Sequence, residues 1–357
     1  MAASPHKEAA VQPGSLRPFF ILWGGQALSL IGSQSVQFAI VWWLNVETGS
    51  AAVLASASFF GLAPQVILGP LLGAFVDRHN RQRVMLFADG GVAAAALVLA
   101  GLFAAGMATP ATIYALLFVR SIGSGLHTPA MLATTSLMVP PEKLVRIQGA
   151  NQALQGGMMI ISAPIGAILA TMLPMPGVML VDVATAAFAI VPLLILTLPN
   201  PSRGPSDASG WRALTRDLLE AVADLRRRHG HAALVAIAAA INLWLVPAFA
   251  LLPLLVSAEL GAGAGRLAAM SSSFGLGIFV GGAVLGAWGG FRKRITTAIA
   301  AVGGLGLAVL GVGLSTAGWS ATAAMFAVGL MLPLANGPIQ AILQTTIEPH
   351  MQGRFFR

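Results

Sequence analysis

The chain has 357 residues, of which 57% are hydrophobic and only 9% charged, and its mean hydropathy is +0.82. A water-soluble domain of this size needs far more charge to cover its surface, so the composition indicates a membrane protein. The formal net charge of +8 comes from short basic clusters between apolar runs, a pattern typical of topology signals and not of nucleic-acid binding. The sequence contains no cysteine, and its six histidines lack the spacing of metal ligands, so we expect no disulfide, thiol chemistry or metal site.

Ten apolar stretches are long enough to cross about 30 Å of hydrocarbon as helices. Because long unbroken apolar runs favour helices over a closed barrel, the sequence predicts an all-α membrane protein. The polar segment before the first stretch has no apolar run of its own, so the first span is expected to direct insertion. The predicted spans are Phe19–Trp43, Val53–Val76, Val84–Gly106, Ala111–Met138, Gln148–Leu173, Val178–Leu198, Ala232–Ser257, Leu267–Gly289, Ile295–Ser315 and Ala321–Ile347.

Basic residues gather on one side of the predicted membrane. If the N-terminus is cytoplasmic, nearly every lysine and arginine lies in a cytoplasmic segment, and the opposite loops hold only Arg266 together with Glu47 and Glu259. Such a bias sets the orientation of helical membrane proteins. We therefore expect a multi-pass protein of the inner (cytoplasmic) membrane with its N-terminus in the cytoplasm.

A polar segment, residues 199–231, divides the chain after six predicted spans. Its apolar residues fall at helical spacing, which predicts an amphipathic helix lying on the inner membrane surface. A solvated linker is the alternative, since the arginine-rich face also suits plain solubility. The apolar residues at this spacing are Trp211, Leu214, Leu218, Val222 and Leu225.

Two motifs recur at a separation of about 210 residues, too long for a solenoid repeat but fitting two halves of one chain. "GPLLGAF" at Gly69–Phe75 recurs as "GAVLGAW" at Gly282–Trp288, and "VPPEKLVR" at Val139–Arg146 matches "IEPHMQGR" at Ile347–Arg354. The sequence therefore predicts two pseudo-symmetric six-span halves, residues 1–198 and 232–357, joined by residues 199–231. Only four spans of the second copy fall within the sequence, so its last two are expected to be missing.

The loop between the second and third spans, "GAFVDRHNRQR", resembles the signature Gly-x-x-x-Asp-Arg-x-Gly-Arg-x-Arg of the major facilitator superfamily. Asn80 stands where the family usually has glycine, and asparagine also tolerates the left-handed backbone of a tight turn. Together with "SLRPFFILWGGQALSLIGS" and "VDVATAAFAIVPL", the sequence resembles the drug-efflux branch with the macrolide exporters and the enterobactin exporter. The residues that match the signature are Gly73, Asp77, Arg78, Arg81 and Arg83.

The resemblance implies that these five residues form a conformational latch between the two halves in the outward-facing state. It also implies that Asp77 points at the start of an eleventh span, which this sequence does not include. From the residues themselves, Gly69 and Gly73 share a helical face and let a neighbouring backbone approach closely in lipid. Asp77 can meet a helix N-terminus or a cation at the inner surface. The alternative is a basic loop that only sets topology.

Three charged residues fall inside predicted spans. Arg120 lies near the middle of the fourth span, where an isolated charge costs several kcal/mol, so we expect it to face a water-filled cavity or an acid. The family resemblance links an arginine in this span to proton coupling, whereas an arginine held by backbone carbonyls is the structural alternative. Asp182 near the outer end of the sixth span and Asp89 near the inner end of the third are candidate proton carriers, unless solvent or a helix terminus satisfies them.

Uncharged polar residues form stripes on several spans. Such residues line a cavity or hold helices together, and the sequence does not distinguish these alternatives. We expect a central substrate cavity formed from Gln26, Ser33, Gln37, Ser124, His127, Gln152, Gln155, Asn242, Asn336 and Gln340.

These features predict a secondary active transporter that exports amphipathic, drug-like or macrolide-like small molecules in exchange for protons by alternating access. The sequence has neither a phosphate-binding Gly-x-x-x-x-Gly-Lys-Ser/Thr loop nor a His-Glu-x-x-His or Gly-x-Ser-x-Gly motif, so we expect no ATPase, no enzyme and no cofactor. The expected partners are a small-molecule substrate, protons and the lipid bilayer, and we expect a monomer. The alternatives are an importer or uniporter of the same fold, or a truncated non-transporting or sensor-like relative.

Overall fold

The computed structural model describes residues 16–198, 229–292 and 294–346. This part of the chain is made of helices and connecting turns, without a β-strand, which confirms the all-α prediction. The first six helices are α1 (Arg17–Thr48), α2 (Ala51–Arg78), α3 (Arg81–Ala104), α4 (Pro110–Met138), α5 (Pro141–Met172) and α6 (Met175–Ile195). They are followed by α8 (His229–Leu254), the π-helical turn η1 (Leu255–Glu259), α9 (Ala264–Trp288), α10 (Arg294–Gly313) and α11 (Gly318–Thr346).

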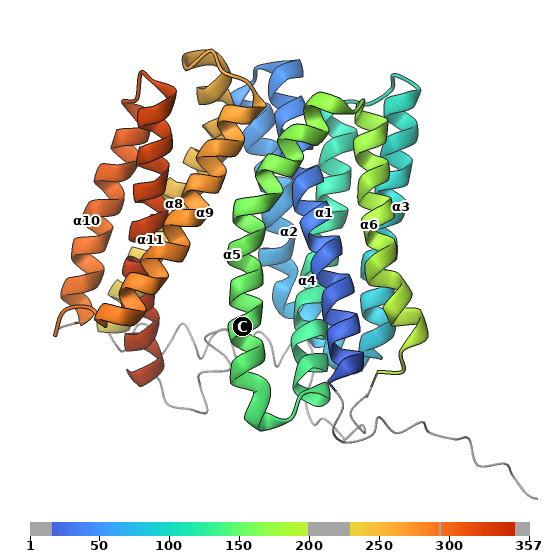
Figure 1. The fold of residues 1–357 in the computed structure, drawn as a ribbon, viewed down its shortest axis with the longest axis horizontal. Coiled ribbons are helices and arrows are strands. Elements are labelled where there is room, and N and C mark those ends of the chain that lie inside the picture. Colours follow the sequence, from blue (N-terminus) through green and yellow to red (C-terminus); the bar gives the residue numbers. More distant parts are fainter. Residues whose placement is uncertain (1–15, 199–228, 293, 347–357) are drawn as a thin grey trace, which may run out of the picture.

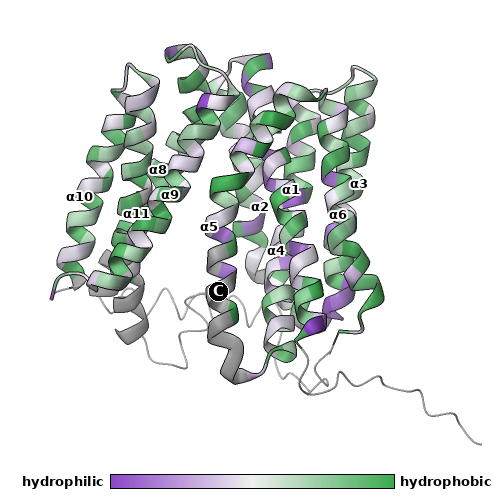
Figure 2. Ribbon diagram, in the orientation of Figure 1, coloured by the Kyte–Doolittle hydropathy of each residue, from purple (hydrophilic) through white to green (hydrophobic). Residues whose placement is uncertain are grey.

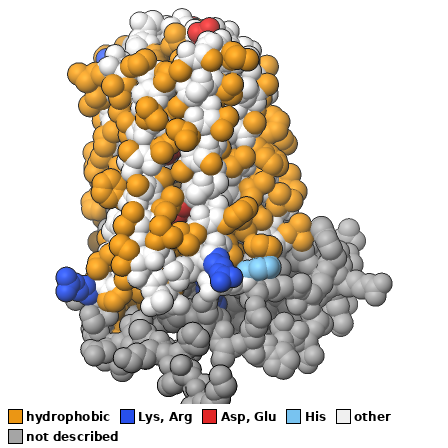
Figure 3. Space-filling view, turned by 90° about the vertical axis from the view of Figure 1, so that its right-hand side faces the viewer, with side chains coloured by type: hydrophobic (Ala, Val, Ile, Leu, Met, Phe, Trp, Pro, Cys, Tyr) orange, Lys and Arg blue, Asp and Glu red, His pale blue; other side chains and the backbone are white. Residues whose placement is uncertain are grey.

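The sides of the helices are covered by hydrophobic side chains (Figures 2 and 3). In the described residues, nine helical stretches are long and apolar enough to cross a membrane, judged by length and composition. The predicted span Ala111–Met138 corresponds to α4, which is long enough but is not among the nine. Its sequence carries Arg120, His127 and several hydroxyl residues, which lower its hydropathy, and α4 packs against α2 and α3 inside the structure.

The charged side chains that are described as exposed lie at the two ends of this hydrophobic belt. Arg81, Arg83 and Arg292 lie at one end, which we call the basic end. Glu47 and Glu259 lie at the opposite end, where α1 and η1 finish. Figure 3 shows most of the blue side chains at the lower end of the hydrophobic belt and red at the upper end, where some blue is also seen, while a little red shows within the belt.

The helices fall into two bundles that stand side by side (Figure 1). In the first bundle, α2 and α3 both pack on α4, α6 packs on α1 and α3, and α5 packs on α1. In the second bundle, α9 and α10 both pack on α11. The order of pairing of α2, α3 and α4 thus recurs in α9, α10 and α11, as the repeated "GPLLGAF" and "GAVLGAW" motifs on α2 and α9 suggest.

Asn80 begins α3 as its N-cap residue. Its side-chain oxygen accepts a hydrogen bond from the backbone N–H of Arg83 at 3.1 Å. Its φ angle is −63°, so the left-handed backbone expected at this position is not present. Asparagine is among the preferred N-cap residues, and here it satisfies a free N–H in the first turn of the helix.

The helices α9 and α11 approach each other through glycine. A Cβ atom at Gly329 would overlap the carbonyl oxygen of Phe274, and one at Gly277 would overlap the carbonyl oxygen of Phe326. Small residues allow such backbone contact between helices in lipid, where no hydrophobic force drives association.

The glycine pair Gly69 and Gly73 on α2 makes no such contact. A Cβ atom at either position would meet no atom of the described residues within 4 Å, so the close backbone approach expected there is not seen in the described part of the chain. Here α2 meets α4 at Gly125, where an added Cβ would overlap the side chain of Leu72. The small residue is therefore on α4, and α2 supplies the bulky side chain.

Two predictions fall on parts of the chain outside the described residues. They are the amphipathic helix, almost all of whose segment lies within residues 199–228, and the second copy of the "VPPEKLVR" motif, which ends at Arg354.

Candidate functional site

Arg120 on α4 and Asp182 on α6 form an ion pair inside the first bundle. Arg120 Nη1 donates to Asp182 Oδ2, and Arg120 Nη2 donates to the carbonyl oxygen of Ser33 at 2.8 Å. The Ser33 hydroxyl in turn donates to Asp182 Oδ1 at 2.7 Å. The Asp182 side chain is 2% exposed and that of Arg120 is 13% exposed. Of the two surroundings expected for Arg120, a cavity or an acid, the structure provides the acid, and each Asp182 oxygen has a partner.

A second polar cluster joins α1, α3 and α4. Gln26 Nε2 donates to Asp89 Oδ2 at 3.1 Å. The other carboxylate oxygen of Asp89 lies 3.9 Å from Nε2 of His127, beyond hydrogen-bond distance. His127 Nε2 is buried and has no hydrogen-bond partner among the described residues. This cluster therefore contains an acid and an imidazole that face each other without a bond.

The two clusters are stacked along the same pair of helices. On α1, Gln26 and Ser33 are seven residues apart, and on α4 the same spacing separates Arg120 from His127. Seven residues are nearly two helical turns, or about 10 Å at 1.5 Å per residue. Both clusters thus lie inside the first bundle at different depths, with Asp89 and His127 nearer the basic end.

The remaining candidate cavity residues whose side chains are described do not belong to either cluster. Gln37 and Asn336 are half-buried, whereas Ser124, Gln155 and Asn242 are exposed. The side chains of Gln152 and Gln340 lie outside the described part of the structure.

The candidate latch residues are only partly described. Gly73 is half-buried, Arg83 is exposed, and Arg81 Nη1 donates to the carbonyl oxygen of Ala133 on α4 at 2.9 Å. The side chains of Asp77 and Arg78 lie outside the described part, so their role stays a prediction.

Gln82 is a structural residue that the sequence analysis missed, although it lies inside the signature loop. Its amide nitrogen donates to the carbonyl oxygens of Leu193 and Leu196, and its amide oxygen accepts from the backbone N–H of Leu198 at 3.2 Å. Free carbonyls at a helix C-terminus need such partners. Gln82 thereby links the start of α3 to the end of α6. The sequence feature that could have pointed to this role is a neutral amide side chain placed between two arginines.

A hydrogen bond between Trp23 on α1 and Asn151 on α5 was also missed. The indole N–H of Trp23 donates to Asn151 Oδ1 at 2.6 Å. A tryptophan within an apolar span needs an acceptor for its N–H, so Trp23 itself was the signal. The predicted polar stripe on α5 named the glutamines beside Asn151 instead.

The two bundles contact each other near the end opposite the basic end, which we call the closed end. Asn45 Nδ2 on α1 donates to Ser257 Oγ on η1 at 2.9 Å, and Ser272 Oγ on α9 donates to the carbonyl oxygen of Ile160 on α5 at 2.8 Å. Phe38 and Trp42 of α1 pack into the apolar cluster formed by α8, η1, α9 and α11. From there, α5 and α9 diverge toward the basic end (Figure 1).

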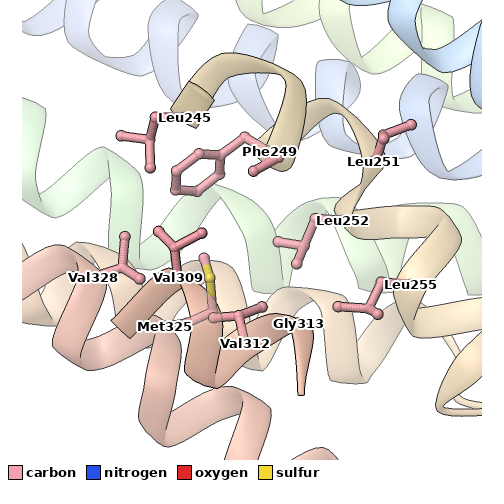
Figure 4. A pocket seen from close by; sticks show the side chains of 11 residues that line it. Leu245, Phe249, Leu251, Leu252, Leu255, Val309, Val312, Gly313, Met325 and Val328 are labelled. Carbon is pink, nitrogen blue, oxygen red and sulfur yellow. The ribbon is translucent and has the colours of Figure 1, made fainter. Parts of the chain in front are cut away.

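An apolar cavity of about 220 Å³ lies in the second bundle between α8, α10 and α11 (Figure 4). Its lining includes Leu245 and Phe249 of α8, Val309 of α10, and Met325 and Val328 of α11. None of its lining residues is charged, so the cavity suits apolar groups only. The described residues also contain no cluster of three or more His, Cys, Asp or Glu that could hold a metal ion.

The sequence profile of the Major Facilitator Superfamily matches residues 22–356. The chain is 34% identical to macrolide efflux protein A of Streptococcus pyogenes over 346 residues, which are 95% of this chain and 84% of the relative. It is 33% identical to macrolide efflux protein A of Enterococcus faecalis over 316 residues, or 86% of this chain and 95% of that one.

Among solved structures, the fold is similar to that of a bacterial homologue of the human lysosomal transporter Spinster in an inward-facing, unoccupied conformation. The TM-score is 0.64 at 16% identity, with 94% of this chain and 77% of that chain covered. These similarities agree with the two helical bundles and with the signature loop between α2 and α3. The chain therefore belongs to the Major Facilitator Superfamily of membrane transporters.

Proposed function

We propose that the protein exports amphipathic small molecules of macrolide type across the cytoplasmic membrane, in exchange for protons and by alternating access. The observation that carries this proposal is the position of the contacts between the bundles. Asn45 with Ser257 and Ser272 with Ile160 join them at the closed end, while α5 and α9 diverge toward the other. Two rigid bundles joined at one end can rock about a central path and expose it to each side in turn.

The direction of transport and the class of substrate are inferred from relatives. Two relatives that cover most of the chain carry the name macrolide efflux protein A. A macrolide-like substrate also suits the purely apolar lining of the cavity between α8, α10 and α11, which can receive an apolar group. We propose that the basic end faces the cytoplasm, in agreement with the positive-inside rule.

Proton exchange is inferred from charges kept inside the first bundle. Arg120, Asp182 and Asp89 are buried or nearly so, and ionisable residues within membrane spans are expensive enough to imply a function. We propose that proton movement through this charged interior is coupled to the rocking of two halves, residues 1–198 and 232–357, with Asp89 as proton carrier and with Arg120 and Asp182 holding the helices around it in place. Gly73, Asp77, Arg78, Arg81 and Arg83 are proposed to act as the conformational latch.

The test is efflux of a radiolabelled macrolide and of a lipophilic dye from cells that express the chain, with and without a proton uncoupler. We expect faster efflux than from cells with an empty vector, and we expect the uncoupler to abolish the difference. A hydrophilic sugar, which should leave both kinds of cell at the same rate, controls for leakage. Efflux that the uncoupler does not change would contradict proton exchange, and net uptake would identify an importer.

A further inference from the structure

The two carboxylates inside the first bundle differ in how completely their oxygens are bonded. Asp182 uses both oxygens, one with Arg120 and one with the Ser33 hydroxyl, and its side chain is only 2% exposed. Asp89 accepts one hydrogen bond, from Gln26, and its other oxygen has only the distant His127 nitrogen in front of it. A proton can be added to Asp182 only by breaking a satisfied ion pair, whereas Asp89 has a free oxygen.

The ring nitrogen Nε2 of His127 faces the free oxygen of Asp89. Buried polar atoms are almost always hydrogen-bonded, yet His127 Nε2 is buried without a partner and lies 3.9 Å from Asp89 Oδ1. That separation fits two lone-pair acceptors that face each other. A single proton on either atom would convert the pair into donor and acceptor, and the gap could close to a charge-assisted hydrogen bond.

From this geometry we propose that Asp89 and His127 together bind the proton that is exchanged during transport, and that Arg120 and Asp182 are a positioning pair that holds α4 and α6. This assignment rests on the proposed proton exchange and names its site. In the step, an O–H bond of a hydronium ion breaks as its proton bonds to a lone pair of His127 Nε2 or Asp89 Oδ1, and a neutral water molecule is left. The same proton is later released to water on the other side of the membrane.

The exposed fraction of the side chains separates the two carboxylates in the same sense. The side chains of Asp89 and His127 are 16% and 13% exposed, against 2% for Asp182. Asp89 lies eight residues from the start of α3, which is about 12 Å from the basic end at 1.5 Å per residue. Asp89 therefore lies between the basic end and the depth of the Arg120–Asp182 pair.

Few other charges act on this site within the described side chains. The neighbouring helix α4 adds Arg120 and α6 adds Asp182, but these two neutralise each other. On α1 the facing side chain is the neutral Gln26. Arg81, at the start of α3, donates to a backbone carbonyl of α4. The charge state of the Asp89–His127 pair thus determines whether α3 and α4 are bonded to each other at this depth.

The experiment uses the full chain in lipid vesicles, a radiolabelled macrolide as the probe and a pH gradient of one unit. Exchange of one proton for one molecule supports about tenfold accumulation at equilibrium. We expect Asp89→Asn to lose this accumulation while it still exchanges labelled for unlabelled macrolide at equal pH. The matched control, Arg120→Gln with Asp182→Asn, removes both charges of the other pair and should keep the tenfold ratio at a lower rate.

His127→Gln provides a second variant if Asp89→Asn does not fold, and it should lose the accumulation as well.

Infrared difference spectra between neutral and acidic pH report protonation without any substrate. The acid-induced change should be smaller in Asp89→Asn than in wild type but unchanged in the double variant. Accumulation retained by Asp89→Asn, or an infrared change lost only in the double variant, would overturn the assignment. If the wild type does not accumulate the macrolide, proton exchange fails and the infrared comparison alone decides the assignment.

Discussion

The first bundle keeps two pairs of ionisable side chains between its helices, Arg120 with Asp182 and Asp89 with His127. In the described part of the second bundle, ionisable side chains such as Arg266 are exposed at the ends of helices. Its interior contacts are made mainly by glycine and apolar side chains, as where Gly329 meets Phe274, and by hydroxyl groups such as that of Ser273, which donates to the carbonyl oxygen of Thr322. Close glycine contacts occur in both bundles, since an added Cβ at Gly25 on α1 would overlap the carbonyl oxygen of Phe188 on α6. The first bundle therefore differs from the second by the ionisable pairs that it keeps between its helices.

The difference has a structural source in α6. This helix fills the space between α1 and α3 in the first bundle, and it brings Asp182 with it. In the second bundle, the space between α8 and α10 holds two cavities of about 220 and 240 Å³, lined by apolar side chains. In the first bundle, α6 therefore both completes the packing and supplies the carboxylate of Asp182. In the second bundle, the cavities between α8 and α10 are lined only by apolar side chains.

The largest effect is expected from breaking the charge pair of the first bundle. Asp182→Asn leaves the Arg120 guanidinium without its counter-ion, and removal of one partner of a buried pair costs about 3–5 kcal/mol. Arg120→Gln combined with Asp182→Asn should recover most of this loss, because no charge is then left uncompensated. Thermal unfolding of the purified proteins in detergent measures the difference. If the double variant is as unstable as the single one, charge compensation is not what stabilises this bundle.

A smaller loss is expected where the second bundle depends on glycine. Gly329→Ala places a methyl group against the carbonyl oxygen of Phe274, and overpacking of this kind costs about 1–3 kcal/mol. Gly282→Ala on α9 is the matched control, because an added Cβ there meets no atom within 4 Å. The control should gain up to about 1 kcal/mol from helix propensity. Equal unfolding temperatures for the two variants would rule out close packing at Gly329 as a source of stability.

The helix positions could be predicted from the sequence because each needs only a long apolar run. The need of Arg120 for an acid or a cavity could also be predicted, since it follows from the cost of a charge in hydrocarbon. Which acid it meets could not, because Asp182 comes close only when α6 packs on α1. The sequence analysis treated Asp182 and Asp89 alike, and only their partners in the structure, Ser33 and Gln26, separate them.

The glycine contacts mark another limit of prediction. Gly69 and Gly73 have the spacing that allows close approach, but spacing describes one face and says nothing of what lies opposite it. In this structure other glycines make the close backbone contacts, such as Gly277 and Gly329 between α9 and α11, and Gly25 of α1 against α6. Glycine spacing shows where helices are able to approach closely, and tertiary packing determines which of these positions make such a contact.

The smallest effect on stability is expected where the two bundles meet. Asn45→Ala removes the hydrogen bond to Ser257 at the closed end, and a net hydrogen bond contributes about 0.5–1.5 kcal/mol. Since this bond joins the two bundles and not the helices within either one, its loss should weaken the closed state of that end more than the fold. We expect an almost unchanged unfolding temperature. We also expect that a cysteine introduced at Ser257 reacts faster with a membrane-impermeant thiol reagent.

The reference for this labelling rate is Ser257→Cys alone, compared with Asn45→Ala and Ser257→Cys combined. Since Ser257→Cys weakens the original bond in both proteins, a second comparison uses a cysteine at Ser272, beside Ile160 on the same interface. Labelling that Asn45→Ala does not change at either position would show that the closed end is held by apolar packing of Phe38 and Trp42, not by this polar contact.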